Sequence, residues 1–226
     1  GEDTDGIMVL DIKAKVGMPA SDYFQLESDI VFDIGLTPNR SDAMGHIGVA
    51  RDLLTVLNHR GSKLEMCKPS TKNFKVDNTN RTIAVEVKDN ELCPRYSAVS
   101  ISNVKVADSP PWIQNKLKAI GITPINNIVD ITNYVLHEIG QPLHAFDIAK
   151  IECKKVVIAT VNDKTKFTTL DDIERELSSD DLMISNTSSP MCIAGVFGGA
   201  DSGVSNTTTD VFLESAYFNP VSVRKT

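Results

Sequence analysis

Apolar residues recur every three or four positions in three stretches of the chain, which is the spacing of an amphipathic helix. The predicted helices run from Ser41 or Asp42 to Gly61, from Ser109 to Gly121 and from Asn126 to Gly140. Each begins at a residue that can cap a helix and ends at a glycine that can stop one. The second carries Pro110 and Pro111 in its first turn, where a missing N–H group costs nothing.

Elsewhere the apolar residues alternate with polar ones, or stand in short runs between turn residues, as in strands. The expected strands cover residues 30–36, 82–88, 95–105, 155–160, 181–185, 191–195 and 211–216. The polar residues 67–80 are typical of a linker. Residues 82–226 thus combine many strands with two helices, which is an α+β pattern. We expect layered, β-sandwich-like sheets with flanking helices, preceded by a small α/β segment.

Composition narrows the class of protein. The 226 residues allow one large or two small domains, and the net charge of -7 argues against holding nucleic acid by bulk electrostatics. The four cysteines are scattered without metal-ligand spacing, so no zinc site is expected. Such cysteines are typical of reduced thiols in a cytoplasmic protein. No apolar run approaches the roughly 20 residues that span a bilayer, so no membrane is expected as a partner.

Candidate chemistry concentrates in residues 130–147. Thr132 and Asn133 lie on the third predicted helix, and His144 follows on a short loop after Gly140. A hydroxyl, an amide and an imidazole that converge could orient a polar substrate and a water molecule. Each group also has a structural reading, in which His144 pins its loop, Thr132 bonds back to its own helix and Asn133 packs or caps.

Two further features could line a binding site. The glycine-rich residues 193–203 match no nucleotide-binding loop and predict a hairpin or bulge, in which Gly195, Gly198 and Gly199 would let a ligand approach the backbone. Glu214 lies in an apolar strand and would point either to solvent or inward. An inward carboxylate needs a partner, because an unpaired buried charge is very costly. A ligand hydroxyl could be that partner.

Several stretches together resemble one family. They are Leu36–Asp42, Arg95–Ala98, Asn126–Val135, Gly140–Asp147, Leu182 with its flanks, Ala194–Gly199 and Glu214–Arg224. In this order they resemble phenylalanyl-tRNA synthetase beta subunits of the bacterial type, along nearly the whole chain. The resemblance implies a piece of a longer polypeptide, in which residues 1–28 are the tail of a preceding tRNA-binding-type domain. Residues 29–80 would be a small strand–helix segment and linker, and residues 81–226 the editing domain.

The resemblance also implies an activity and its residues. The editing domain of the family hydrolyses the ester of tyrosine wrongly attached to phenylalanine tRNA. The family's pocket falls on catalytic residues His144, Thr132 and Asn133 and on substrate-binding residues Glu214, Gly195 and Ala194, with no metal. The implied partners are phenylalanine tRNA and the alpha subunit, in a heterotetramer of two alpha and two beta subunits. ATP and Mg²⁺ would serve the whole enzyme, and no cofactor is expected in this chain.

Two functional alternatives remain open from the sequence. One is a non-catalytic module that scaffolds the synthetase and contacts tRNA. The other is a free-standing deacylase related to the editing domain.

Overall fold

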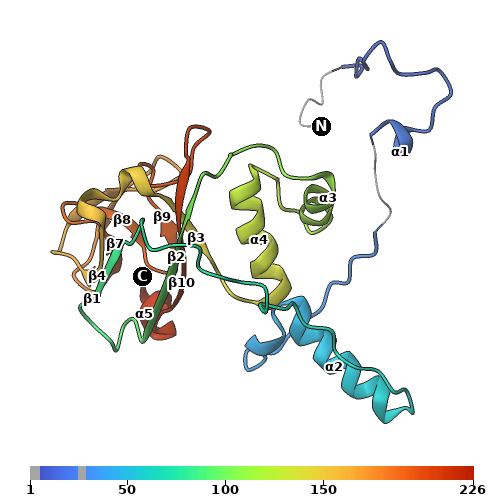
Figure 1. Cartoon of the computed structure of the whole chain (residues 1–226). Coiled ribbons are helices and arrows are strands. Elements are labelled where there is room, and N and C mark those ends of the chain that lie inside the picture. Colours follow the sequence, from blue (N-terminus) through green and yellow to red (C-terminus); the bar gives the residue numbers. More distant parts are fainter. Residues whose placement is uncertain (1–5, 25–28) are drawn as a thin grey trace.

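Two β-sheets face each other in the computed structural model, which describes residues 6–24 and 29–226 (Figure 1). The five-stranded sheet has the order β1 (Ala84–Val87), β4 (Lys155–Thr160), β7 (Leu182–Ser185), β8 (Pro190–Ile193) and β9 (Phe197–Gly198). The three-stranded sheet has the order β2 (Arg95–Ser102), β10 (Asp210–Tyr217) and β3 (His144–Asp147). A small hairpin joins β5 (Thr165–Thr168) to β6 (Glu174–Leu177). Apart from the parallel pair β1–β4, all of these pairings are antiparallel.

One hydrophobic core fills the space between the two large sheets. Its main members from the five-stranded sheet are Val156, Ile158, Leu182 and Ile184, and from the three-stranded sheet Phe146 and Phe212. A second cluster, including Met183 and Ile193, covers the other face of β7 and β8. Burial on both faces explains the unbroken apolar run in β7, since a half-exposed strand would alternate.

Helices α3 (Pro111–Ala119) and α4 (Asn127–Ile139) lie beyond the three-stranded sheet, on the side away from the five-stranded sheet (Figure 1). The predicted limits of α4 are confirmed. The side chain of Asn126 accepts hydrogen bonds from the backbone N–H groups of Ile128 and Val129, both at 3.0 Å. Gly140 ends the helix in the left-handed conformation at φ 78°.

The predicted cap of α3 is wrong. Its N-cap is Pro110, whose side chain makes no capping bond. Ser109 instead donates a 2.5 Å hydrogen bond to the buried carboxylate of Asp130, which also accepts from the backbone N–H of Ile125 at 2.8 Å. A buried carboxylate needs such donors, and it takes the hydroxyl away from the helix start.

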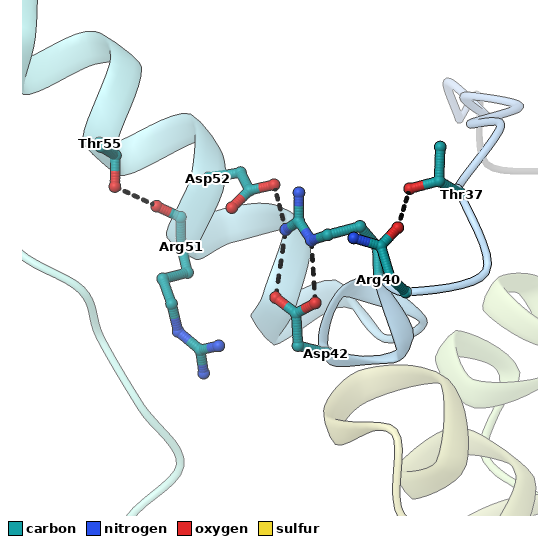
Figure 2. Close-up of polar contacts among 7 residues, drawn as sticks. Thr37, Arg40, Asp42, Arg51, Asp52 and Thr55 are labelled. Carbon is teal, nitrogen blue, oxygen red and sulfur yellow. Dashed lines mark hydrogen bonds and ion pairs between the residues drawn. The ribbon is translucent and has the colours of Figure 1, made fainter.

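Helix α2 (His46–His59) confirms the first predicted helix, although it starts later than expected. The residues around Ser41 form a separate turn, η1 (Ser41–Ala43), and Gly45 is the N-cap of α2. Arg40 holds this turn by ion pairs with Asp42 at 2.9 Å and Asp52 at 2.6 Å (Figure 2). The start of α2 lies against the end of α4, where a Cβ on Gly45 would come within 2.7 Å of the Gly140 nitrogen.

The strand expected at residues 30–36 does not form. This segment has no strand pairing in the described part of the chain, and Ile30 and Phe32 remain 77% and 79% exposed. A strand needs a neighbour for its backbone groups and its apolar face, and no neighbour lies there. His144 was expected on a loop but lies in β3, because this segment pairs with β10.

Other elements complete the chain. Residues 67–80, predicted as a linker, contain no helix or strand. Short elements that the pattern did not predict are α1 (Ala20–Tyr23), η2 (Ile148–Lys150), η3 (Glu152–Lys154) and α5 (Pro220–Lys225), besides β5, β6 and β9. The predicted segment 1–28 lies partly outside the described residues. Helices within the described ranges are all too short or too polar to cross a membrane.

Candidate functional site

His144 and Glu214 lie directly opposite each other on neighbouring strands. His144 is the first residue of β3, and the antiparallel register pairs it with Glu214 of β10. Residues that face each other in this way point to the same side of the sheet, with Cβ atoms about 5 Å apart. The next pair on that side, Phe146 and Phe212, belongs to the core between the sheets. His144 and Glu214 therefore point toward the five-stranded sheet.

His144 is largely withdrawn from water. Its ring meets the Phe146 ring edge to face at a centroid distance of 4.5 Å. Its Nε2 atom is buried and has no hydrogen-bond partner within the described ranges. This burial lowers the pKa of His144 to about 4, because an imidazolium ion would lose its hydration. At neutral pH the ring is therefore uncharged.

Burial also shifts the pKa of Glu214, but upward rather than downward. Its side chain is only 5% exposed, and burial raises the pKa of its carboxyl group to about 7. No cation or hydrogen-bond donor among the described residues offsets that burial. Between about pH 4 and 7 both members of the pair are uncharged, and Glu214 ionises near neutrality. The sequence left open whether the Glu214 side chain points to solvent or inward. In the structure it points inward.

Tyr96 is a third polar residue on this face, and sequence reasoning missed it. It pairs with Ala216 of β10, two positions along from Glu214, so its side chain shares their side of the sheet. Its phenol oxygen is buried without a hydrogen-bond partner in the described part of the chain. The alternation of β2 gave no clear signal, because Val99 and Ile101 lie on the opposite face from Tyr96, so the direction of Tyr96 follows only from the register with β10.

Thr132 and Asn133 lie on α4, which contacts β3. The Thr132 hydroxyl donates a 2.7 Å hydrogen bond to the Val129 carbonyl oxygen, so its structural reading is confirmed in the free protein. Asn133 is half-buried. Among the described residues, no hydrogen bond links either side chain to His144 or Glu214. The geometry thus brings His144 and Glu214 together and leaves the two helix residues behind the sheet that carries them.

Ala194 and Gly195 form the turn between β8 and β9, which confirms the predicted hairpin. Gly195 has a φ of 71°, a conformation that favours glycine. A Cβ on Gly195 would lie 3.1 Å from the ring of Phe218, so its nearest neighbours are apolar. Gly198 is the glycine that lies against His144: a Cβ there would come within 2.9 Å of the imidazole Cε1. The hairpin backbone therefore lies directly on the ring of His144.

Two cavities of the described molecule lie elsewhere. One of about 470 Å³ is lined in part by Lys150, Lys166 and Asn186, and another of about 540 Å³ lies beside Asn219 and Ser222. Neither is lined by any of the six predicted pocket residues. Across residues 6–24 and 29–226, no group of three or more histidine, cysteine, aspartate or glutamate side chains could hold a metal ion.

Comparison with known proteins gives consistent matches. The family model of the B3/4 domain matches residues 92–226. The phenylalanine–tRNA ligase beta subunits of Bacteroides thetaiotaomicron and Porphyromonas gingivalis are each 52% identical, over 226 and 227 residues, and that of Salinibacter ruber is 44% identical over 229. Each match covers the whole chain but only 27–28% of the relative.

A search among solved structures finds an N-terminal fragment of the phenylalanyl-tRNA synthetase beta subunit from Pyrococcus horikoshii. It covers 82% of this chain and 55% of that chain, with 14% identity and a TM-score of 0.48.

Proposed function

Because the chain belongs to the B3/4 domain family and matches phenylalanine–tRNA ligase beta subunits along its whole length, we propose that it hydrolyses the ester of tyrosine wrongly attached to phenylalanine tRNA. The observation that supports this most is the pair of His144 and Glu214: the buried Nε2 atom of His144 has no partner among the described residues, and burial alone shifts the pKa of the Glu214 carboxyl. Buried polar groups are almost always hydrogen-bonded, so an exception calls for a ligand or bound water.

The proposed selectivity depends on one hydroxyl group. Tyrosine is phenylalanine with a phenol oxygen added, and an apolar pocket rejects such an addition only about 10²-fold. A second site that binds the hydroxyl can select tyrosine, because phenylalanine would leave its polar groups unpaired. In this proposal the ionised Glu214 and the backbone near Gly195 form hydrogen bonds with the phenol hydroxyl, while Ala194 leaves room for the ring.

The proposed hydrolysis needs water rather than a covalent nucleophile. Water adds to the ester carbonyl carbon, and the bond from that carbon to the ribose oxygen breaks. The ribose oxygen takes up a proton and becomes a hydroxyl as the amino acid leaves. With a pKa near 4, neutral His144 is a weak base but can accept a hydrogen bond and so orient the water. Thr132 and Asn133 lie behind the sheet, so they are proposed to position the ester only where the substrate passes the edge strand β3. This also requires Thr132 to exchange its bond to Val129. Orientation of this kind can supply much of the acceleration.

The wider assignment concerns the complete enzyme. We propose that residues 1–28 end a tRNA-binding-type domain, that residues 29–80 connect it, and that residues 81–226 form the editing domain. The complete cytoplasmic ligase would contain two alpha and two beta subunits, bind phenylalanine tRNA, and use ATP and Mg²⁺. The acidic charge of this chain agrees with tRNA being held mainly by other parts of that assembly.

The test is deacylation of tyrosine-charged phenylalanine tRNA by the complete ligase. His144→Ala and Glu214→Ala are each expected to slow hydrolysis by about 10²-fold, the effect typical of losing one positioned polar group. Thr71→Ala, at an exposed position of residues 67–80, is the control and should hydrolyse at the unchanged rate. If neither His144→Ala nor Glu214→Ala slows hydrolysis, the editing assignment is wrong.

The second candidate is the non-catalytic scaffold. It is favoured by one observation, the exposed apolar side chains at residues 30–36, which suit a surface covered by other parts of a larger protein. Full hydrolysis by His144→Ala and Glu214→Ala, together with failure of Phe32→Ser to assemble with the rest of the ligase, would support this candidate instead.

A further inference from the structure

Tyr96 brings a hydrogen-bond donor into the core without a partner. Its phenol oxygen is buried and unpaired in the described molecule, although its ring packs among the residues between the two sheets. Burial first, and the negative charge of Glu214 second, raise the pKa of the Tyr96 phenol. The group therefore stays protonated and can donate a hydrogen bond throughout the physiological range.

The strand register fixes the relation between Tyr96 and Glu214. Tyr96 faces Ala216, and Glu214 faces Ala98, so the two polar residues are diagonal neighbours on one side of the sheet. Diagonal neighbours are about 7–8 Å apart, which long side chains can bridge. The buried thiols of Cys93 and Cys192 also lie near, because the charge of Glu214 contributes to raising the pKa of each thiol. Tyr96 and Glu214 thus lie beside each other against one packed apolar cluster.

The backbone N–H of Gly195 makes no hydrogen bond among the described residues, whereas those of its two neighbours in the hairpin are engaged. The backbone N–H of Ala194 already donates to the Leu182 carbonyl at 2.9 Å, and that of Val196 donates to the Ile193 carbonyl at 3.0 Å. A hydroxyl ligand is both a donor and an acceptor. The Glu214 carboxylate can accept from it but cannot donate, so a complete match requires a separate donor.

We propose that Tyr96 is a side-chain donor beside the Gly195 N–H: its hydroxyl donates a hydrogen bond to the phenol oxygen of the tyrosyl group, while the Glu214 carboxylate accepts a hydrogen bond from the phenol. This inference rests on the proposed function and makes Tyr96 a specificity-determining residue. Phenylalanine carries neither a donor nor an acceptor on its ring, so its ester would leave both Tyr96 and Glu214 unpaired. The pair together, rather than Glu214 alone, separates the two amino acids.

The test compares Tyr96→Phe with Tyr217→Phe in the complete ligase. Both changes remove one phenol oxygen, but Tyr217 lies at the end of β10 on the other side of the sheet and is 58% exposed. Hydrolysis of the tyrosine ester should fall about tenfold in Tyr96→Phe, as expected for one lost hydrogen bond, while hydrolysis of the phenylalanine ester stays unchanged. Tyr217→Phe should change neither rate.

Measurements of melting temperature and of amino acid binding show whether a negative result contradicts the role of Tyr96 or the proposed function. Tyr96→Phe removes an unpaired buried hydroxyl, so its melting temperature should not fall; a lower melting temperature would indicate a structural hydrogen bond and overturn the proposal. An unchanged tyrosine rate in Tyr96→Phe, with loss of activity in Glu214→Ala, overturns the role of Tyr96 but leaves the proposed function intact. Calorimetric binding of free tyrosine and phenylalanine gives an independent result: Tyr96→Phe should weaken only tyrosine binding, and equal loss for both amino acids contradicts the proposal.

Discussion

The two sheets that share one core contribute opposite kinds of side chain to it. The five-stranded sheet contributes apolar residues such as Val156, Ile158 and Ile184, all fully buried. The three-stranded sheet places His144 and Glu214 on its inward face, beside Phe146 and Phe212. Burying unpaired polar groups opposes folding, whereas burying apolar ones stabilises it. The difference indicates that the first sheet serves stability, whereas the second gives up some stability by burying polar groups, as the proposed binding site would require.

The largest expected effect is a loss of stability from the apolar sheet. Ile184→Ala removes a fully buried side chain at the centre of that sheet and should lower the free energy of unfolding by about 2–5 kcal/mol. Val85→Ala, a 41% exposed position in β1 of the same sheet, is the matched control and should have a much smaller effect. Urea titration of the chain measures both. Equal losses would mean that the sheet does not carry the core.

In the three-stranded sheet, which we call the polar sheet, replacing a buried polar residue should raise the free energy of unfolding rather than lower it. The folded-state pKa of Glu214 is raised to about 7, so the folded chain binds the proton more tightly than the unfolded chain. The corresponding stability is present below about pH 4.5 and is lost as the pH rises to 7. Glu214→Gln removes this loss and should stabilise the chain by on the order of 2–3 kcal/mol at pH 8 but little at pH 4.5.

Thermal unfolding of the two proteins at both pH values measures this difference. His144, with its pKa lowered to about 4, contributes the reverse trend, since its stability is lost as the pH falls from 6.5 through 4. It does so in both proteins and cancels from the comparison. A Glu214→Gln chain that is less stable than the parent at pH 8 would show that the carboxylate has a partner in the folded state.

A smaller loss of stability is expected where Gly198 of the five-stranded sheet lies against the His144 ring of the three-stranded sheet. Gly198→Ala would place a methyl group 2.9 Å from His144 Cε1 and 2.8 Å from Leu170 Cδ1. Neighbouring side chains must move to avoid this clash, which should lower the free energy of unfolding by about 1–3 kcal/mol and rotate the His144 ring. The variant should therefore show both a lower stability and shifted NMR signals of the His144 ring. Gly203→Ala, whose nearest contact is 3.7 Å, is the control and should leave the His144 signals in place.

The smallest effect concerns the helix behind the polar sheet. Asn126→Ala removes the cap of α4 and should lower stability by about 1 kcal/mol. Asn126→Ser retains a capping oxygen and should recover most of it. Denaturant titration of the three proteins checks the order, and a loss as large as that of Ile184→Ala would show that α4 belongs to the stabilising core.

Local signals in the sequence were sufficient for parts of this structure. Asn126 and Gly140 bound α4 because capping depends only on neighbouring backbone groups. The strand pattern succeeded at residues 82–88 and failed at residues 30–36, although both are apolar, because only the first has a partner strand. Pairing of distant segments is not encoded in a local pattern.

The same limit applies to the site. The inward direction of Glu214 depends on the register of β10 with β2 and β3, and the inclusion of Tyr96 follows from that register. Composition and spacing could mark His144 and Glu214 as candidates only separately. Their pairing required the fold.

The measurement that tests the central claim most directly is a crystal structure of the chain with bound tyrosine. The account predicts that the phenol oxygen lies within about 3 Å of the Glu214 carboxylate, between the two sheets, with the amino acid backbone toward His144. Tyrosine bound elsewhere, or with its hydroxyl in solvent, would contradict the assignment of the polar sheet as a tyrosine-selective site.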